Sequence, residues 1–176
     1  TYPLLVDTSF STHGAKLQDI YWLHRNEQHK VVWSQISQAM DTPTTEDGSW
    51  GVLARRDSGH DWVHGARSVR TFGNPDKYDG TDVYGMSFRP SQVTAAIMVG
   101  LAHGKSSTGN NDIEFAWRLT AAGSLEVVES GAVRMQAGSY AVDDLLELRL
   151  NSNGEVEYVH NKGVVYTSSR STPLPL

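Results

Sequence analysis

The sequence contains no cysteine, which excludes a disulfide framework, a thiolate metal site and a cysteine nucleophile. No apolar run approaches the roughly 20 residues that span a bilayer, so we expect no transmembrane segment. No basic and apolar signal peptide opens the given chain. The absence of cysteine does not indicate the cellular compartment, since a domain of 176 residues needs no disulfide to be stable.

Concentrated positive charge is also missing. The formal net charge is −5 and the sequence pI is about 5.7. The densest basic group, made of Arg55, Arg56, Arg67 and Arg70, is interrupted by aspartates. Because phosphate backbones require a concentrated basic surface, we expect no nucleic-acid partner.

Alternating apolar and polar residues dominate the stretch from Tyr84 to Ser168. Successive side chains of a strand point to opposite faces, so alternation indicates a strand with one buried face. Short strands separated by Gly, Asn and Asp turns are typical of an antiparallel sandwich or barrel. The sequence therefore predicts an all-β fold, with strands at 86–88, 95–102, 112–120, 124–130, 132–137, 144–150, 155–160 and 163–168.

The segment 1–30 differs from the rest and predicts a short N-terminal extension. Residues 1–10 are expected to form an edge strand. The near-helical spacing of Leu17, Ile20, Tyr21 and Leu23 indicates a short helix, against which Gly14 counts. Further strands are expected at 31–37, 50–56 and 66–72. The predicted organisation is an extension at 1–30, a β-sandwich domain at 31–168 and an extended tail at 169–176.

An acidic turn at 73–82 carries the best candidate metal ligands. Asp76, Asp79 and Asp82 supply carboxylate oxygens of the kind that calcium prefers. Tyr78 occupies a position where the helix-loop-helix calcium pattern needs a ligand. Ordinary turn chemistry, in which Asp and Asn bond their own backbone, explains the same residues. Calcium binding at these three aspartates is therefore one hypothesis, and a turn without bound metal is the other.

Catalytic motifs are not recognisable. Glycosidase chemistry needs two carboxylates that face each other across a cleft, and the strand glutamates share the parity expected of the solvent face. Glu129 is the exception, because it shares parity with Leu125 and Val127. Neither a nucleophile elbow nor the paired acidic motif of sandwich glucanases occurs. We therefore expect a protein that is not an enzyme. The glutamates expected to face solvent are Glu114, Glu126, Glu147, Glu155 and Glu157.

Aromatic and polar residues in the loops suggest where a ligand would bind. Trp62 and His64 lie in a Gly-rich polar segment, and Tyr78 and Asp79 lie in the acidic turn. Exposed aromatic rings stack on sugars or on protein partners, and Asp and His supply hydrogen bonds to hydroxyl groups. These four residues are the candidate ligand-binding set, although packing in the core is the better explanation of the tryptophan.

A series of short motifs occurs, each once, between Val31 and Ser168. They are 62–68 (WVHGARS), 82–88 (DVYGMSF), 98–101 (MVGL), 112–116 (DIEFA), 123–131 (GSLEVVESG), 138–145 (GSYAVDDL) and 156–168 (VEYVHNKGVVYTS). In this order they resemble a subgroup of the concanavalin A-like lectin/glucanase superfamily, related in shape to laminin-G and SPRY modules of cell-surface and secreted proteins. The resemblance implies a jelly-roll β-sandwich with no catalytic set, and slightly favours an extracellular or cell-surface location.

Three functions follow from these patterns. The first is a lectin-like module that binds a carbohydrate or glycoconjugate. The second is a structural or accessory subunit that docks on a larger protein assembly through its termini. Its anchors would be the apolar residues of the N-terminal segment and the Pro-Leu-Pro-Leu tail at 173–176; the N-terminal ones are Tyr2, Leu4, Leu5, Ile20, Tyr21 and Trp22. The third is a glucanase-type hydrolase, which requires two carboxylates facing each other in a groove. A packed N-terminus favours the first function, and exposed termini favour the second.

Overall fold

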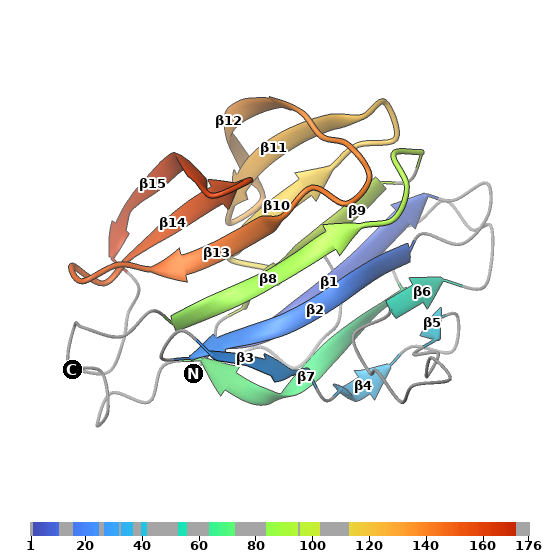
Figure 1. Cartoon of the computed structure of the whole chain (residues 1–176), viewed down its shortest axis with the longest axis horizontal. Helices are drawn as coiled ribbons and strands as arrows, with labels where there is room; N and C mark the ends of the chain where they lie inside the picture. Colours follow the sequence, from blue (N-terminus) through green and yellow to red (C-terminus); the bar gives the residue numbers. More distant parts are fainter. Residues whose placement is uncertain are drawn as a thin grey trace.

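A computed structural model places the chain in two antiparallel β-sheets (Figure 1). It describes residues 2–10, 16–24, 27–31, 33–36, 40–41, 53–55, 64–72, 84–94, 96–102 and 113–171. Every regular element in these ranges is a strand, which confirms the all-β prediction. The same ranges hold no helix that is long and apolar enough to cross a membrane.

Sheet A has the strand order β12-β11-β10-β9-β1-β7-β4, and it lies behind sheet B in Figure 1. Adjacent strands in it are antiparallel, and the β1 strand lies in the middle of the sheet between β9 and β7. Its strands are β1 (Tyr2–Phe10), β4 (Trp33–Ile36), β7 (His64–Phe72), β9 (Ala96–Leu101), β10 (Phe115–Leu119), β11 (Ser124–Glu129) and β12 (Ala132–Ser139).

Sheet B has the strand order β15-β14-β13-β8-β2-β6-β5, and β3 also pairs with β2. All of these pairings are antiparallel. Its strands are β2 (Lys16–His24), β3 (Glu27–Lys30), β5 (Met40–Asp41), β6 (Leu53–Arg55), β8 (Tyr84–Pro90), β13 (Leu146–Leu150), β14 (Glu155–His160) and β15 (Gly163–Ser171).

The main core lies between the two sheets and follows the predicted alternation. Trp117 of β10 and Tyr158 of β14 are fully buried and meet edge to face, with ring centroids 5.3 Å apart. The indole Nε1 of Trp117 donates a hydrogen bond of 2.9 Å to the backbone oxygen of Glu147, so one side chain links sheet A to sheet B. Burial of these large rings is a main source of the sandwich's stability.

Two tight turns join β13 to β14 at 151–154 and β14 to β15 at 161–162. In the first turn Gly154, which follows Asn153, has a positive φ of 77°. In the second turn the positive φ values belong to Asn161 and Lys162, at 48° and 74°. Gly163 begins β15, so here two residues with side chains adopt the left-handed conformation that glycine favours.

The N-terminal residues differ from the sequence-based expectation. Residues 2–10 form a central strand and not an edge strand, and residues 16–24 form the strand β2 and not a helix. A register irregularity lies between Gln18 and Tyr21, and Asp19 has a positive φ of 52°. This irregularity brings Leu17 and Ile20 to the same buried face at a spacing of three, which is why the pattern looked helical.

Candidate functional site

The ligand-binding residues proposed from sequence fall almost entirely outside the described ranges. Trp62, Tyr78 and Asp79 lie outside them, as do the remaining proposed calcium ligands, Asp76 and Asp82. His64 begins β7, where its backbone is paired with Thr8 of β1. Within the described ranges no group of three or more His, Asp or Glu side chains is placed to hold a metal ion. The calcium hypothesis therefore stays a prediction.

The outer face of sheet B carries polar and aromatic side chains on four neighbouring strands. The backbone register pairs Tyr21 of β2 with Ser87 of β8, and Ser87 with Glu147 of β13. In the next row Arg149 of β13 is paired with Glu157 of β14. These five residues face away from the core because their strand neighbours Trp22, Met86, Leu148, Val156 and Tyr158 are buried between the sheets. We call this set the polar stripe.

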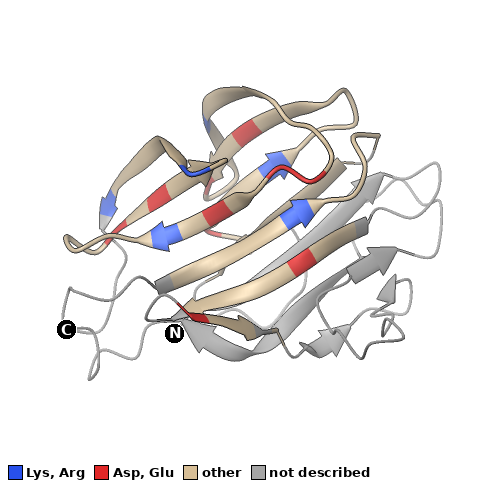
Figure 2. Ribbon diagram, in the orientation of Figure 1, with Lys and Arg blue, Asp and Glu red and all other residues tan. Residues whose placement is uncertain are grey.

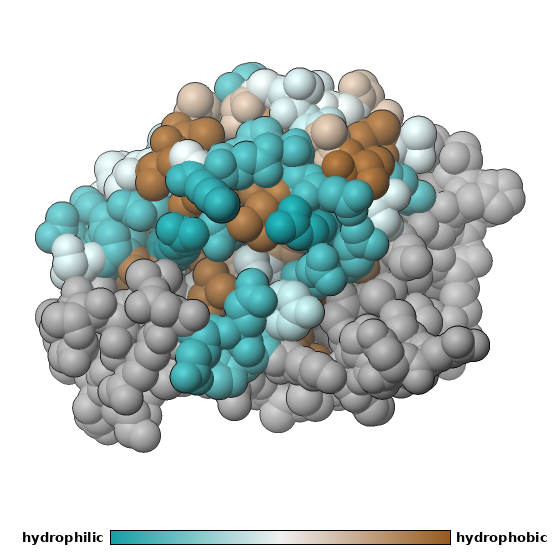
Figure 3. Space-filling model, in the orientation of Figure 1, coloured by the Kyte–Doolittle hydropathy of each residue, from teal (hydrophilic) through white to brown (hydrophobic). Residues whose placement is uncertain are grey.

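Exposure varies along the polar stripe. Ser87 and Glu147 are buried, with relative exposures of 1% and 4%, although they lie on the outer face. Tyr21, Arg149 and Glu157 are partly exposed. Figure 2 shows the charged segments of β13 and β14 on the sheet nearest the viewer, and Figure 3 shows that much of the described surface there is hydrophilic. The accessible part of the stripe therefore consists of an aromatic ring, a guanidinium group and a carboxylate.

Electrostatic pairing organises the charged end of the stripe. A terminal nitrogen of Arg149 donates a hydrogen bond of 2.6 Å to Oε2 of Glu147. The Arg149 side chain is 32% exposed and that of Glu147 only 6%, so the guanidinium group lies outermost. Asn151 Nδ2 donates to Glu155 and Glu157, which holds the second carboxylate beside this pair. Burial and charge pairing together favour a preorganised surface.

Two polar atoms of the stripe have no hydrogen-bond partner among the described residues. They are the hydroxyl oxygen of Ser87 and Nε of Arg149, both buried in the described structure. A buried polar group without a partner costs about 1–3 kcal/mol. Such groups are uncommon in folded proteins and call for an explanation such as a ligand or an ordered water.

The two carboxylates of the polar stripe differ in accessibility. Glu147 and Glu157 lie on one face of sheet B, but a hydrolase needs two carboxylates that face each other across a cleft. Glu147 is buried, with a relative exposure of 4%, and its Oε2 is ion-paired with Arg149. Glu157 is the more accessible carboxylate.

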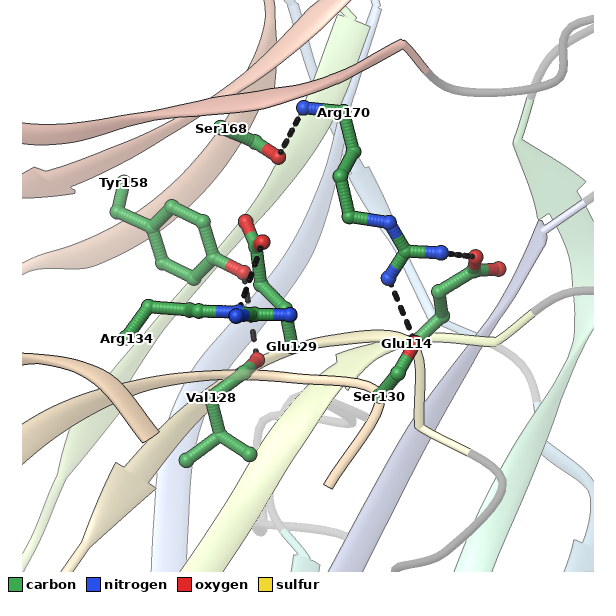
Figure 4. Close-up of polar contacts among 8 residues, drawn as sticks. All are labelled: Glu114, Val128, Glu129, Ser130, Arg134, Tyr158, Ser168 and Arg170. Atoms are coloured by element: carbon green, nitrogen blue, oxygen red, sulfur yellow. Dashed lines mark hydrogen bonds and ion pairs between the residues drawn. The ribbon is translucent and has the colours of Figure 1, made fainter. Parts of the chain in front are cut away.

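A second polar cluster lies where β12 and β15, the edges of the two sheets, approach each other (Figure 4). Glu129 at the end of β11 points into the sandwich and is only 1% exposed, as its parity with Leu125 and Val127 indicates. Its Oε2 lies 3.6 Å from Nε of Arg134, while its Oε1 has no hydrogen-bond partner among the described residues. Burial and the negative charge of Glu129 raise the pKa of Tyr158 well above its ordinary value, which keeps that phenol neutral.

Arg170 of β15 forms the other half of the cluster in Figure 4. Its guanidinium group donates hydrogen bonds of 2.9 Å to Glu114 and 2.6 Å to the Ser130 hydroxyl, both on sheet A's side. The same group lies 5.7 Å from the ring centroid of Phe115. Arg170 therefore fastens the last strand of sheet B to the loop regions that flank β10 and β11.

Comparison of the chain with family models, with curated proteins and with solved structures finds no match in any of the three. The chemistry of the described side chains is consequently the basis for assigning a function.

Sequence reasoning missed the polar stripe for a physical reason. Alternation placed Glu147 correctly on the outer face but indicated a solvated side chain, and Glu126 likewise. Both are nearly buried, because an arginine lies against each carboxylate. Glu147 is covered by Arg149, two residues along the same strand, and Glu126 by Arg118 on the neighbouring strand. The Glu-x-Arg spacing at Glu147 and Arg149 was the available signal, since residues i and i+2 share one face of a strand.

Proposed function

We propose that this protein is a non-catalytic, lectin-like binding module for a carbohydrate or another polyhydroxylated ligand, bound on the polar stripe of sheet B. The carrying observation is that the strand register brings Tyr21, Arg149 and Glu157 to one accessible face. An aromatic ring stacks on the apolar face of a sugar, while charged and amide groups bond its hydroxyls.

The proposed fold in finer detail is a jelly roll of the concanavalin A-like type. Two features support it: each sheet contains neighbours that are distant in sequence, such as β13 beside β8 and β9 beside β1, and the ordered motif series resembles that superfamily. Trp62, His64, Tyr78 and Asp79, with calcium at Asp76, Asp79 and Asp82, are the alternative proposed site; His64 lies on β7 of sheet A, apart from the polar stripe of sheet B.

Docking as an accessory subunit through the N-terminus has less support. Ile20 and Trp22, two of its expected anchors, are 0% and 3% exposed and belong to the main core. Side chains committed to the core of their own domain are not available to hold a partner. The packed N-terminal strands therefore favour ligand binding over docking through this segment.

A glycan array probed with the full chain, in calcium and in EDTA, tests the proposal. Binding that is lost in Tyr21→Ala and kept in Val164→Ala supports the polar stripe, because Val164 is an exposed residue of β15. Binding that is lost in Trp62→Ala and Asp79→Ala but kept in Tyr21→Ala moves the site to the loops. Loss in EDTA alone indicates calcium dependence. A blank array, with each variant as heat-stable as the wild type, contradicts the proposal.

A further inference from the structure

The strand β12 is an exposed edge of sheet A. It pairs with β11 on one side, and no other described strand pairs with it on the other side. Seven of its residues are exposed and Ala137 is intermediate, so neither face of the strand is covered. Its backbone groups on the free side are therefore available to pair with another strand, which is the usual hazard or use of a sheet edge.

Two cross-strand rows of hydrophobic side chains in sheet A end at β12. On the inner face, Trp117 is paired with Val127, and Val127 with Met135 of β12. On the outer face, the row runs from Ala116 through Val128 to Val133 of β12. Met135 and Val133 end these rows and are 37% and 42% exposed. One added strand would continue both rows and cover both side chains.

Exposed charge beside this edge is positive, although the whole chain is acidic. Each of three arginine–glutamate pairs places its arginine outermost, with side-chain exposures of 44% against 1%, 39% against 18%, and 31% against 10%. In each pair the carboxylate is less exposed than the guanidinium group. Arg134 of β12 pairs with Glu129, Arg170 of β15 pairs with Glu114, and Arg118 lies two strands from the edge, on β10, paired with Glu126 of β11. A partner with carboxylates would meet complementary charge at Arg134 and Arg170.

A β-bulge explains how Arg134 reaches this position. Val127 and Val128 are adjacent in β11, whereas their partners Met135 and Val133 are separated by Arg134. The bulge leaves Arg134 as the extra residue, and its side chain turns toward Glu129. Met135 and Val133 consequently lie on opposite faces of the strand.

We propose that β12 is a docking edge for an extended segment of a partner protein, in which apolar residues alternate with acidic and polar ones. The segment adds to sheet A as a further antiparallel strand. Main-chain hydrogen bonds to β12 supply the affinity, apolar side chains cover Met135 and Val133, and carboxylates face the exposed arginines. This surface is separate from the polar stripe, so the inference does not depend on the proposed function.

The test uses the full ¹⁵N-labelled chain and three synthetic peptides followed by NMR. The first is an acetylated, amidated octapeptide in which valine alternates with glutamate and threonine. The second replaces each glutamate by lysine, and the third carries N-methyl groups on alternate amides that block strand pairing. We expect the first peptide to shift β12 amide signals and to slow their hydrogen exchange, and the other two to bind at least roughly tenfold more weakly.

A variant pair checks the location. Met135→Asp should weaken binding of the first peptide by roughly tenfold or more, because it places like charge in the strand–strand contact. Val164→Asp, at an exposed apolar position of β15, should leave binding unchanged. Equal binding of all three peptides, or shifts confined to other strands, overturns the proposal. Concentration-dependent dimerisation through β12 would also overturn it, by showing that a second copy occupies the edge.

Discussion

Single residues set how closely the strands pack, and Gly100 of β9 is the sharpest case. A Cβ built on it would lie 1.9 Å from the Phe115 backbone oxygen and 2.8 Å from Ile113 Cγ2. Neither the backbone oxygen nor the neighbouring strand can move away without breaking the sheet. Glycine is therefore required here by the close approach of β10 and not by its own φ angle.

We predict that Gly100→Ala lowers the free energy of unfolding by about 3 kcal/mol, the upper range for overpacking a core. Gly163→Ala is the matched control, since its new Cβ would meet only an ordinary contact, 3.5 Å from the His160 backbone oxygen. That control should change stability by less than about 0.5 kcal/mol. Urea denaturation of both variants measures the difference, and equal effects would contradict the described strand spacing.

Glu129 and Arg134 predict an asymmetry between two neutral substitutions. Arg134→Gln leaves a carboxylate that is only 1% exposed without its ion-pair partner. Glu129→Gln removes the buried charge itself and leaves an arginine whose side chain is 44% exposed. The first should cost about 2–3 kcal/mol and the second less than about 1 kcal/mol. The opposite order in chemical denaturation would show that the buried carboxylate is needed for stability.

At the scale of elements, Asp144 ties the loop before β13 to the hairpin between β14 and β15. Burial alone would raise the pKa of Asp144. Hydrogen bonds from the Asn161 side chain, the Ala141 backbone and His160, together with the charge of His160, lower it below its ordinary value. The Nε2 atom of His160 lies 2.8 Å from Oδ2 of Asp144, and Asn161 Nδ2 donates to Oδ1 at 2.8 Å.

The lowered pKa fixes the sign of a pH effect. An acid whose folded-state pKa is depressed stabilises the fold above its unfolded pKa, and the contribution is lost as the pH falls through the folded value. Asp144→Asn should therefore lower the free energy of unfolding at pH 7 by about 1 kcal/mol. The difference from wild type should shrink as the pH falls below about 4. A difference that does not change between pH 7 and pH 2.5 would contradict this account.

Strands from Tyr84 onward could be predicted from sequence because alternation and turn residues agree there. The strand β10 shows where alternation predicts the buried face correctly and where it fails. Phe115, Trp117 and Leu119 face the main core as expected, but Ile113 packs with Ala116 in a second cluster on the outer face. Ile113 precedes the strand, so the period of two does not apply to it.

The first strands could not be predicted with the same success, again for a physical reason. A register irregularity at Gln18 to Tyr21 changes the period of β2, and a central strand such as β1 reads as a short apolar stretch like any edge strand. Sheet position depends on pairing between residues far apart in sequence, such as Val6 with Val99. Local patterns do not contain that information.

At the scale of the whole molecule, the two sheets form three regions of different character. The space between the sheets holds the core, the outer face of sheet B carries the polar stripe, and β12 forms an open edge. Of these, the core was predictable from alternation. The stripe was not, because it joins residues from β2, β8, β13 and β14 that only the register brings together.

The most direct test of the central claim is a calorimetric titration of the tightest saccharide from the glycan array into wild type, Tyr21→Ala and Val164→Ala. The account predicts that Tyr21→Ala weakens binding by up to roughly tenfold, since stacking on a ring contributes about 0.5–1.5 kcal/mol. It predicts no change for Val164→Ala, which is exposed on β15 and outside the stripe. Equal affinity of all three proteins would contradict binding at the polar stripe.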